Sequence, residues 1–178
     1  MTLEGLAKQG REKIYSSLAG RNYNEIISKR SNLMQCFSKI EEIEHKREFV
    51  AKIKEISFVN DARSINANST WFTMENITNR IVWILDIDNT EMDFTLLFPI
   101  CREKVGNIIC FGANKEKGVE IFNGLVSGVY EVNNIQEAVI FANAIAENDD
   151  VVLYSPANGN REDVEIKGNA FRKAVNEI

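Results

Sequence analysis

The chain has 178 residues, 44% of them hydrophobic, which is enough for one substantial core but hardly for two. Its 21 Lys and Arg residues against 26 Asp and Glu residues give a formal net charge of −5 and no basic field for nucleic acid or an anionic membrane. The sequence has neither a secretory signal nor a run of about 18 apolar residues, so we expect a cytoplasmic protein. Three widely spaced cysteines and one histidine predict no disulfide framework and no zinc site, and we expect Cys36, Cys101 and Cys110 to be reduced core residues.

The first fifty residues have a charged, mostly helical pattern. Their apolar positions form one stripe made by Leu33, Met34, Phe37 and Ile40. We place the boundary between this arm and the rest of the chain near Glu42.

Beyond that boundary, apolar runs alternate with helix-period segments, which is typical of an α/β sheet covered by helices. Helices are predicted after the polar run 66–69, from Ile135 to Ala146 behind the N-cap candidates Asn133 and Asn134, and from Phe171 to Ile178. By propensity, residues 44–54 also favour a helix. The candidate strands are Ile56–Asn60, Ile81–Leu85, Asn107–Phe111, Gly128–Val132 and Val151–Tyr154.

Residues 43–49 (IEHKREF) and 58–66 (FVNDARSIN) are the first of several ordered motifs in this part of the chain. They resemble I-E-H-R-L-E and F-I-N-D-S-K-A-T-N, which follow each other in the C-terminal domain of MurD proteins in the Mur ligase family. Residues 150–157 (DVVLYSPA) and 168–171 (GNAF) are close to G-D-x-V-L-L-S-P-A and R-G-x-x-F. The resemblance runs from about Leu33 to the end, and residues 10–19 look like the last part of the family's central ATPase domain.

The resemblance implies an α/β fold with a Rossmann-like, mostly parallel twisted sheet of about five or six strands and helices on both faces. It also implies that residues 44–54 contain a strand, hairpin-paired with Ile56–Asn60, and not a helix. Residues 1–41 would be a helical arm, a remnant of the ATPase domain of a truncated ligase. Residues 42–178 would be a Mur ligase C-terminal-like domain standing alone.

The ligases of this family activate a carboxylate with ATP, which they hold on a loop of the Gly-Lys-Thr type. Neither Gly-Lys-Thr nor Gly-Lys-Ser occurs in this sequence. The resemblance assigns a nucleotide contact to Lys46 and Asp61, although both are also compatible with ordinary polar groups at a surface or a strand end. A lysine at position 46 keeps the charge of the family's arginine but not its bidentate geometry.

The family's amino-acid site is altered more strongly. Arg63 and Ile65 replace the Lys and Thr of S-K-A-T, and residues 86–90 replace G-G-x-x-K with a segment containing Asp86 and Asp88. These carboxylates would repel glutamate. After Ala157, residues 158–162 replace the serine-bearing C-A-S-x-D motif with a shorter loop.

We therefore expect a different site at the carboxyl ends of the strands. Arg63 and Arg161 could form a new anion site there, although two solvated arginines would fit the sequence as well. No catalytic residue, metal or cofactor is expected. The predicted ligand-binding residues are Lys46, Asp61, Arg63, Asp86, Asp88, Ser155, Asn158 and Arg161.

The function predicted first is a non-catalytic binding or regulatory module, a pseudoenzyme related to peptidoglycan precursor synthesis. Its partner would be an unknown small anion or a protein in the former amino-acid cleft, and a homodimer through the former interdomain face stays open. The alternative is a phosphatase of the haloacid-dehalogenase type, because residues 86–90 (DIDNT) resemble D-x-D-x-T, with Asp86 as nucleophile and Asp88 as general acid. A polar loop at a strand end is the plainer interpretation of the same residues.

Overall fold

The computed structural model describes residues 44–88, 93–157 and 159–178. The chain divides into two units, of which Ile43–Ile178 is the second. The predictions for residues 1–41, including the helical arm and Cys36, lie outside the described residues. Within the described ranges, no helix is long and apolar enough to cross a membrane.

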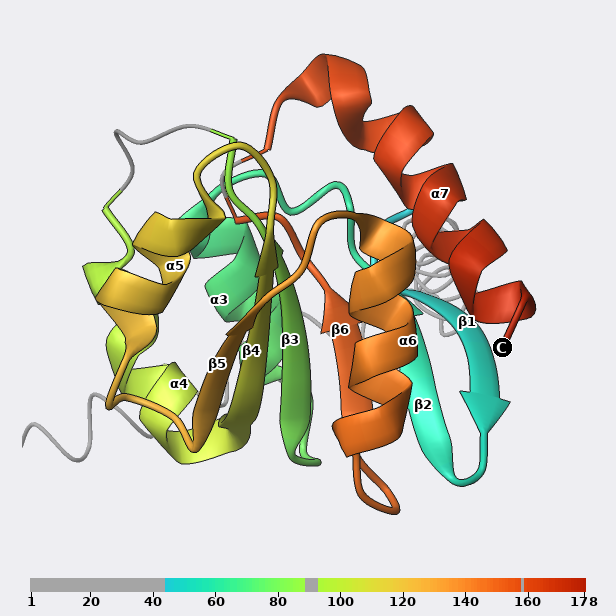
Figure 1. Cartoon of the computed structure of the whole chain (residues 1–178), viewed down its shortest axis with the longest axis horizontal. Coiled ribbons are helices and arrows are strands. Elements are labelled where there is room, and N and C mark those ends of the chain that lie inside the picture. The colour runs from blue at the N-terminus through green and yellow to red at the C-terminus, as the bar shows by residue number, and fades with distance from the viewer. Residues whose placement is uncertain (1–43, 89–92, 158) are drawn as a thin grey trace, which may run out of the picture. The chain divides into compact units, whose positions relative to one another are not determined.

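In the described residues, six strands form one sheet in the order β1-β2-β6-β3-β4-β5 (Figure 1). All neighbouring strands are parallel except the antiparallel pair β1 and β2. The prediction of a mostly parallel sheet is thereby confirmed. The strands are β1 (Glu48–Ile53), β2 (Ile56–Asn60), β3 (Ile81–Asp86), β4 (Val105–Phe111), β5 (Gly128–Glu131) and β6 (Val151–Tyr154).

The β1–β2 hairpin confirms the strand that the resemblance implied within residues 44–54, and it shows that the helix favoured there by propensity does not form. Its loop consists of two residues, Lys54 and Glu55, with φ angles of 49° and 67°. Positive φ at both central residues is the geometry of a type I′ turn, whose twist matches the twist of the paired strands. Cross-strand pairing therefore overrides the helix propensity of this charged segment.

In the described part of the chain, four α-helices and one 3-10 turn connect the strands, and a second 3-10 turn and a fifth α-helix follow the last strand. Two of the predicted helices begin behind an asparagine cap: the side chains of Asn66 and Asn134 accept hydrogen bonds from the amides of Ser69 and Glu137. The sequence had not predicted α4 or α5, and it placed the start of α7 seven residues too late. The elements are α3 (Ala67–Glu75), η1 (Thr95–Leu97), α4 (Phe98–Lys104), α5 (Lys115–Phe122), α6 (Ile135–Ile145), η2 (Arg161–Asp163) and α7 (Val164–Asn176).

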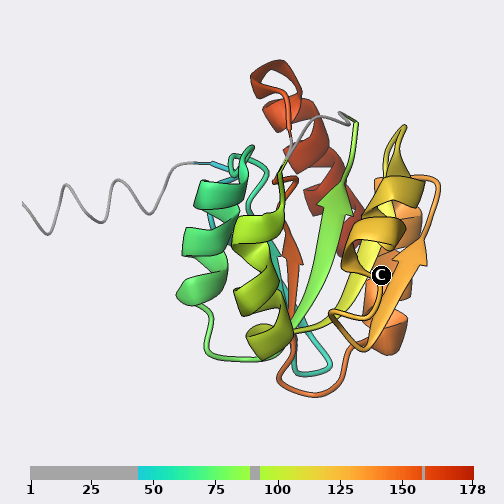
Figure 2. The same ribbon diagram turned by 90° about the vertical axis from the view of Figure 1, so that its left-hand side faces the viewer.

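The helices cover both faces of the sheet, as the views in Figures 1 and 2 show. On one face α3, α4 and α5 pack around Trp83, whose ring meets Phe122 edge-on at 5.3 Å. On the other face α6 and α7 pack around Tyr154, whose ring stacks on Phe171 at 5.3 Å. Successive residues of β3 alternate between the two cores, which explains why the strand is buried along its whole length.

This arrangement creates two crevices beside β6. The neighbours β2 and β3 are each followed by a helix on one face, α3 and α4, whereas β6 is followed by α7 on the other face. In open α/β sheets, ligands bind at the carboxyl ends of the strands where consecutive connections diverge in this way. The fold therefore offers one such crevice between β2 and β6 and a second between β6 and β3.

Cys101 and Cys110 are buried and free, as the sequence predicted. Burial raises the pKa of each thiol to about 12. Both are therefore neutral near physiological pH and are core residues without nucleophilic character.

Candidate functional site

A pocket of about 470 Å³ lies at the carboxyl ends of β2 and β6. Among the described residues that line it, three side chains are cationic and none is acidic. They come from three separate segments: the residues before β1, the β2–α3 connection, and the η2–α7 segment. The lining residues are Lys46, Arg63, Ser64, Ile65, Asn66, Ser69, Arg161 and Val164.

The three cations of this pocket have no carboxylate partner among the described residues. The ion pairs of the described ranges use other cations, such as Arg80, Lys167 and Arg172. In a chain with a net charge of −5, three positive charges that form no ion pair within the described residues favour the binding of an anion at this pocket.

Arg63 is held in place by the segment that precedes β1. Its backbone amide donates to the carbonyl oxygen of His45 at 3.0 Å, and its side-chain Nε donates to the carbonyl oxygen of Glu44 at 2.6 Å. The two terminal nitrogens make no hydrogen bond within the described residues. They can therefore engage a carboxylate or phosphate in the paired geometry that suits a guanidinium group.

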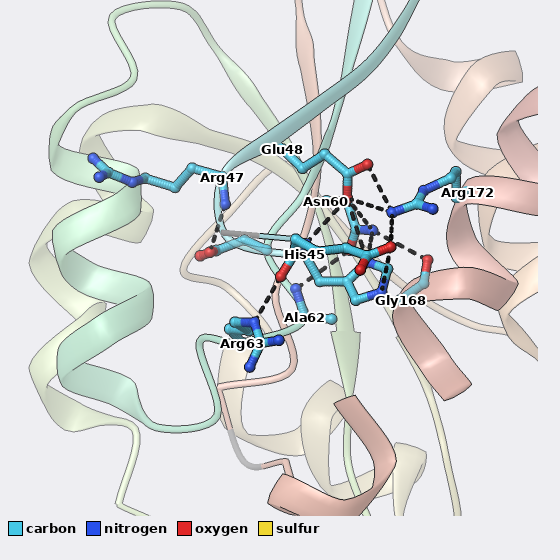
Figure 3. A network of polar contacts seen from close by, with 10 residues as sticks. His45, Arg47, Glu48, Asn60, Ala62, Arg63, Gly168 and Arg172 are labelled. Atoms are coloured by element: carbon cyan, nitrogen blue, oxygen red, sulfur yellow. Dashed lines mark hydrogen bonds and ion pairs between the residues drawn. The ribbon is translucent and has the colours of Figure 1, made fainter. Parts of the chain in front are cut away.

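A polar network around the buried ring of His45 fixes this segment (Figure 3). Asn60 Nδ2 lies 2.9 Å from His45 Nδ1, 3.1 Å from the carbonyl oxygen of Gly168 and 3.2 Å from Glu48 Oε2. Arg172 closes the network from α7, with its Nη2 atom 2.9 Å from Glu48 Oε1. The network thereby joins the start of the domain to β2 and α7.

The backbone of the segment before β1 is strained, and its contact with α7 is tightly packed. His45 and Arg47 have φ angles of 60° and 49°, a region that non-glycine residues rarely adopt. Gly168 packs so closely on His45 that an added Cβ would lie 2.5 Å from the ring carbon Cγ. The surrounding contacts hold Lys46, which lies between the two strained residues, at the rim of the pocket.

The second crevice, between β6 and β3, is filled by an ion triad. The ammonium group of Lys167 lies 2.6 Å from Asp86 Oδ2 and 2.5 Å from Asp88 Oδ2. Asp86 ends β3 and its side chain is 2% exposed, whereas the side chain of Asp88 is 49% exposed. An internal lysine therefore neutralises much of the charge of the two carboxylates that the sequence analysis assigned to a ligand site.

Asp86 is the most perturbed carboxyl group in this crevice. Burial raises its pKa to about 6, against the opposing hydrogen bond and charge of Lys167, and the nearby charges of Asp88 and Asp163 add to the rise. Its second oxygen, Oδ1, is buried without a hydrogen-bond partner in the described residues, as is the hydroxyl of Tyr154. For Asp88 burial also opposes ionisation, but the hydrogen bonds from Lys167 and the Ala113 amide lower its pKa overall.

Two other predicted residues serve the interior. Asp61 is fully buried, its Oδ1 accepts a hydrogen bond from the Arg47 amide at 3.0 Å, and burial raises its pKa. Ser155 is also buried, and its hydroxyl lies 2.7 Å from that of Thr70. Both side chains support the loops beneath the pocket instead of lining it.

The structure thus divides the eight predicted residues. Lys46, Arg63 and Arg161 gather around one pocket, Asp86 and Asp88 form the neighbouring triad, and Asn158 lies outside the described residues. The prediction missed Lys167. This lysine stands where the family's R-G-x-x-F motif has its arginine, and that match of a basic residue could have marked Lys167 as a candidate site residue. The prediction also missed the polar residues of the pocket wall, Ser64, Asn66 and Ser69.

A pocket of about 320 Å³ at the opposite end of the sheet makes a useful contrast. Its two cations are already engaged: Arg80 pairs with Glu147 at 3.0 Å, and Lys104 donates to the carbonyl oxygens of Met74, Glu75 and Ile77 at the end of α3. These contacts give both cations a role in the fold. The first pocket is therefore the better candidate for a ligand site.

Comparison with known proteins agrees with this architecture. No protein family model matches the chain. The UDP-N-acetylmuramoylalanine–D-glutamate ligase of Christiangramia forsetii is 29% identical over 182 residues, and the ligase of the same name from Bacteroides fragilis is 31% identical over 183 residues. Each alignment covers 100% of this chain but only 41% of the relative, so the chain spans about two fifths of the length of these ligases.

The solved structure of a murein peptide ligase, Mpl of Psychrobacter arcticus, shares the fold. It matches with a TM-score of 0.51 and 11% identity, covering 76% of this chain and 31% of that protein. The ordered motifs, the similarity to MurD-type ligases over the whole chain, and the six-stranded α/β sheet together identify this chain as a C-terminal-type domain of the Mur ligase family.

Proposed function

We propose that this MurD-like domain is a non-catalytic binding module, related to peptidoglycan precursor synthesis, whose ligand is a compact anion with two or more negative charges. The observation that carries the proposal is the convergence of Lys46, Arg63 and Arg161 on one pocket without a carboxylate partner in the described residues. A volume of about 470 Å³ suits a small molecule.

The charge balance of the pocket supports an anionic ligand. A cation that forms no ion pair within the protein binds most strongly to a ligand of opposite charge. Hydrogen bonds that involve charged groups are about twice as strong as those between neutral groups. The side-chain amide nitrogen of Asn66 offers a further donor at the wall, whereas the hydroxyl of Ser69 donates to Asn66 in the cap of α3. A dianionic phosphate ester and a di- or tricarboxylate share the required chemistry.

The composition of the site supports a role without catalysis. The described residues that line the pocket include no carboxylate and no histidine, the usual kinds of general base. At the positions of the family's glycine turn and lysine, this chain has Asp86 and Asp88 bound to Lys167, and the sequence contains no Gly-Lys-Thr or Gly-Lys-Ser. These features favour binding over amide-bond formation.

One observation favours the phosphatase as a second candidate. The D-x-D-x-T type of site needs a lysine near its aspartates, and Lys167 contacts both Asp86 and Asp88. Two other parts of such a site have no counterpart at this edge of the sheet. The next strand, β4, ends in Phe111, and the acidic pair Asp149 and Asp150 precedes β6 at the opposite edge.

The test of the binding proposal is calorimetry and thermal shift with inorganic phosphate, citrate and D-glutamate at low ionic strength. We expect phosphate or citrate to bind the unmodified chain, and Arg63→Gln and Arg161→Gln each to weaken binding roughly tenfold or more. Arg102→Gln is the matched control, because Arg102 is an exposed arginine of α4 that does not line the pocket. Equal affinities for all three variants would refute the proposed site.

The same protein preparations test the phosphatase. Magnesium-dependent hydrolysis of p-nitrophenyl phosphate, abolished by Asp86→Asn, would favour that candidate over the binding module. We expect no hydrolysis above the rate of the heat-denatured control.

A further inference from the structure

Lys167 is positioned between two features that have opposite charge requirements. The anion pocket needs a positive field, yet the adjacent crevice contains Asp86 and Asp88. Without a counter-ion, these carboxylates would repel any anion entering the pocket. Lys167 pairs with both of them.

The same helix also carries part of the pocket wall. Val164 and Arg161 line the pocket, and Val164 lies three residues before Lys167, on the same side of α7. Arg161 belongs to the 3-10 turn that leads directly into the helix. The ion pairs of Lys167 therefore attach the pocket-forming end of α7 to the end of β3.

A second contact fixes the next residue of the helix. Gly168 packs on the ring of His45, and its carbonyl oxygen accepts a hydrogen bond from Asn60 at 3.1 Å. His45 is adjacent to Lys46, which lines the same pocket as Arg161 and Val164. Residues 167 and 168 thus join α7 to β3 and to the segment before β1.

The attachment to β3 depends strongly on the lysine. Asp86 is almost completely buried. Lys167 contacts its Oδ2 atom, and its Oδ1 atom has no hydrogen-bond partner within the described residues. A buried carboxylate that loses its cation must take up a proton or move toward water. Either response would release the start of α7 from β3.

We propose that Lys167 is a positioning residue of the anion pocket: by bridging Asp86 and Asp88 it holds the η2–α7 segment so that Arg161 and Val164 face the ligand. This inference rests on the proposed function, because the pocket is the site that Lys167 would organise. Lys167 itself is absent from the pocket lining and acts through the segment that it anchors.

The experiment compares variants of the full chain by calorimetry with inorganic phosphate and citrate, and by hydrogen exchange over residues 161–168. Lys167→Met should weaken probe binding roughly tenfold or more and speed exchange in this segment, whereas Lys167→Arg should retain most of both properties. Lys173→Met is the matched control, since Lys173 lies on the same helix, is 70% exposed and makes only a long pair with Glu177. It should change neither property.

Asp88→Asn provides a second variant in case Lys167→Met does not fold. Asp88 is half-exposed, so the loss of its charge leaves no buried ion without a partner. This variant should also speed exchange over residues 161–168, by less than Lys167→Met.

Unchanged exchange in Lys167→Met and in Asp88→Asn would overturn the positioning role, even if binding fell, because Lys167 would then act on the ligand through its charge alone. If the unmodified chain bound neither probe, the proposed function would fail, and with it the role of Lys167 in that pocket. Exchange would then test separately whether Lys167 anchors the segment: faster exchange over residues 161–168 in Lys167→Met would support the anchor, and exchange equal to that of the unmodified chain would overturn it.

Discussion

Lys167 and Asp86 are 81 residues apart in the sequence, yet the ammonium nitrogen lies 2.6 Å from a carboxylate oxygen that is almost completely buried. The pair joins α7, which covers one face of the sheet, to the end of β3 at the sheet's centre. Even with this cation beside it, Asp86 keeps a pKa of about 6, since desolvation of the buried carboxylate outweighs the attraction of the lysine. The stability of this contact therefore depends on pH.

The first prediction concerns that dependence. The pKa of Asp86 is raised from 3.8 to about 6 in the folded protein. Between pH 3.8 and about 6, the folded protein therefore keeps a proton on Asp86 that the unfolded chain has released. The contribution of Asp86 to the free energy of unfolding is thus fully present below about 3.8 and is lost as pH rises through about 6. Its upper bound is roughly 3 kcal/mol at 1.36 kcal/mol per pKa unit.

Chemical denaturation from pH 4.5 to 7.5 measures this effect. Relative to Asp86→Asn, the unmodified protein should gain stability as the pH falls. Asp88→Asn is the control, because the pKa of Asp88 is lowered from 3.8 and its stabilising contribution is lost only at more acidic pH. The difference in the free energy of unfolding between the unmodified protein and Asp88→Asn should therefore stay constant from pH 4.5 to 7.5. If the difference in the free energy of unfolding between the unmodified protein and Asp86→Asn stayed constant over this range, the prediction would be contradicted.

The second prediction concerns Gly112, which follows β4 and has a φ of +103°. An added Cβ would lie 2.6 Å from the carbonyl oxygen of Ile87 and 2.8 Å from Asp86 Oδ1. Gly112→Ala should therefore destabilise the fold by about 2 to 4 kcal/mol, the sum of backbone strain and a steric clash. Gly124→Ala isolates the strain, because Gly124 also has a positive φ, of +76°, but no atom within 4 Å of the added Cβ. Equal losses of thermal stability in the two variants would show that the clash is relieved without cost.

The third prediction concerns the β1–β2 turn, where Lys54 adopts a φ of 49°. Asparagine tolerates this region better than lysine does and is favoured at the first central position of a type I′ turn. Lys54→Asn should stabilise the protein by about 0.5 to 1 kcal/mol in urea denaturation. Lys54→Ala should not raise the free energy of unfolding. A similar rise in both variants would show that removing the lysine charge, and not the turn geometry, stabilises the protein.

The central strands could be predicted from the sequence because they are apolar runs, whereas β1, a charged segment, was expected only from the resemblance to the family. The bounds of β2 and β6 match the prediction, and β3 extends it by one residue. The helices α4 and α5 were missed because they are short and, in α5, contain few apolar residues. The start of α7 was missed because Val164 and Gly168, which face the core there, are small residues that make a weak periodic signal.

The candidate site was only partly predictable for a different reason. Strand-end position indicates the correct edge of the sheet, and three cations from three separate segments meet there. It does not indicate whether a side chain faces the pocket or the interior, and Asp61 turns inward to accept the Arg47 amide. The pairing of Lys167 with Asp86 joins residues from distant elements, so no local pattern in the sequence encodes it.

The last prediction is that this chain has no MurD ligase activity. Three requirements are unmet in its own residues. There is no Gly-Lys-Thr or Gly-Lys-Ser loop for ATP, Thr90 stands at the lysine position of the family's G-G-x-x-K motif beside Asp86 and Asp88, and residues 158–162 replace the serine-bearing loop after Ala157. Losing one charge-assisted anchor typically costs about 1.5 to 3 kcal/mol, so the loss of several weakens glutamate binding by orders of magnitude. The measurement is phosphate release with ATP, magnesium, D-glutamate and UDP-N-acetylmuramoyl-L-alanine, with the full-length Bacteroides fragilis ligase as positive control and calorimetry with D-glutamate alone. Turnover above background, or glutamate binding in the millimolar range or tighter, would mean that Arg63 and Lys167 rebuild the amino-acid site in a form that the sequence comparison does not reveal.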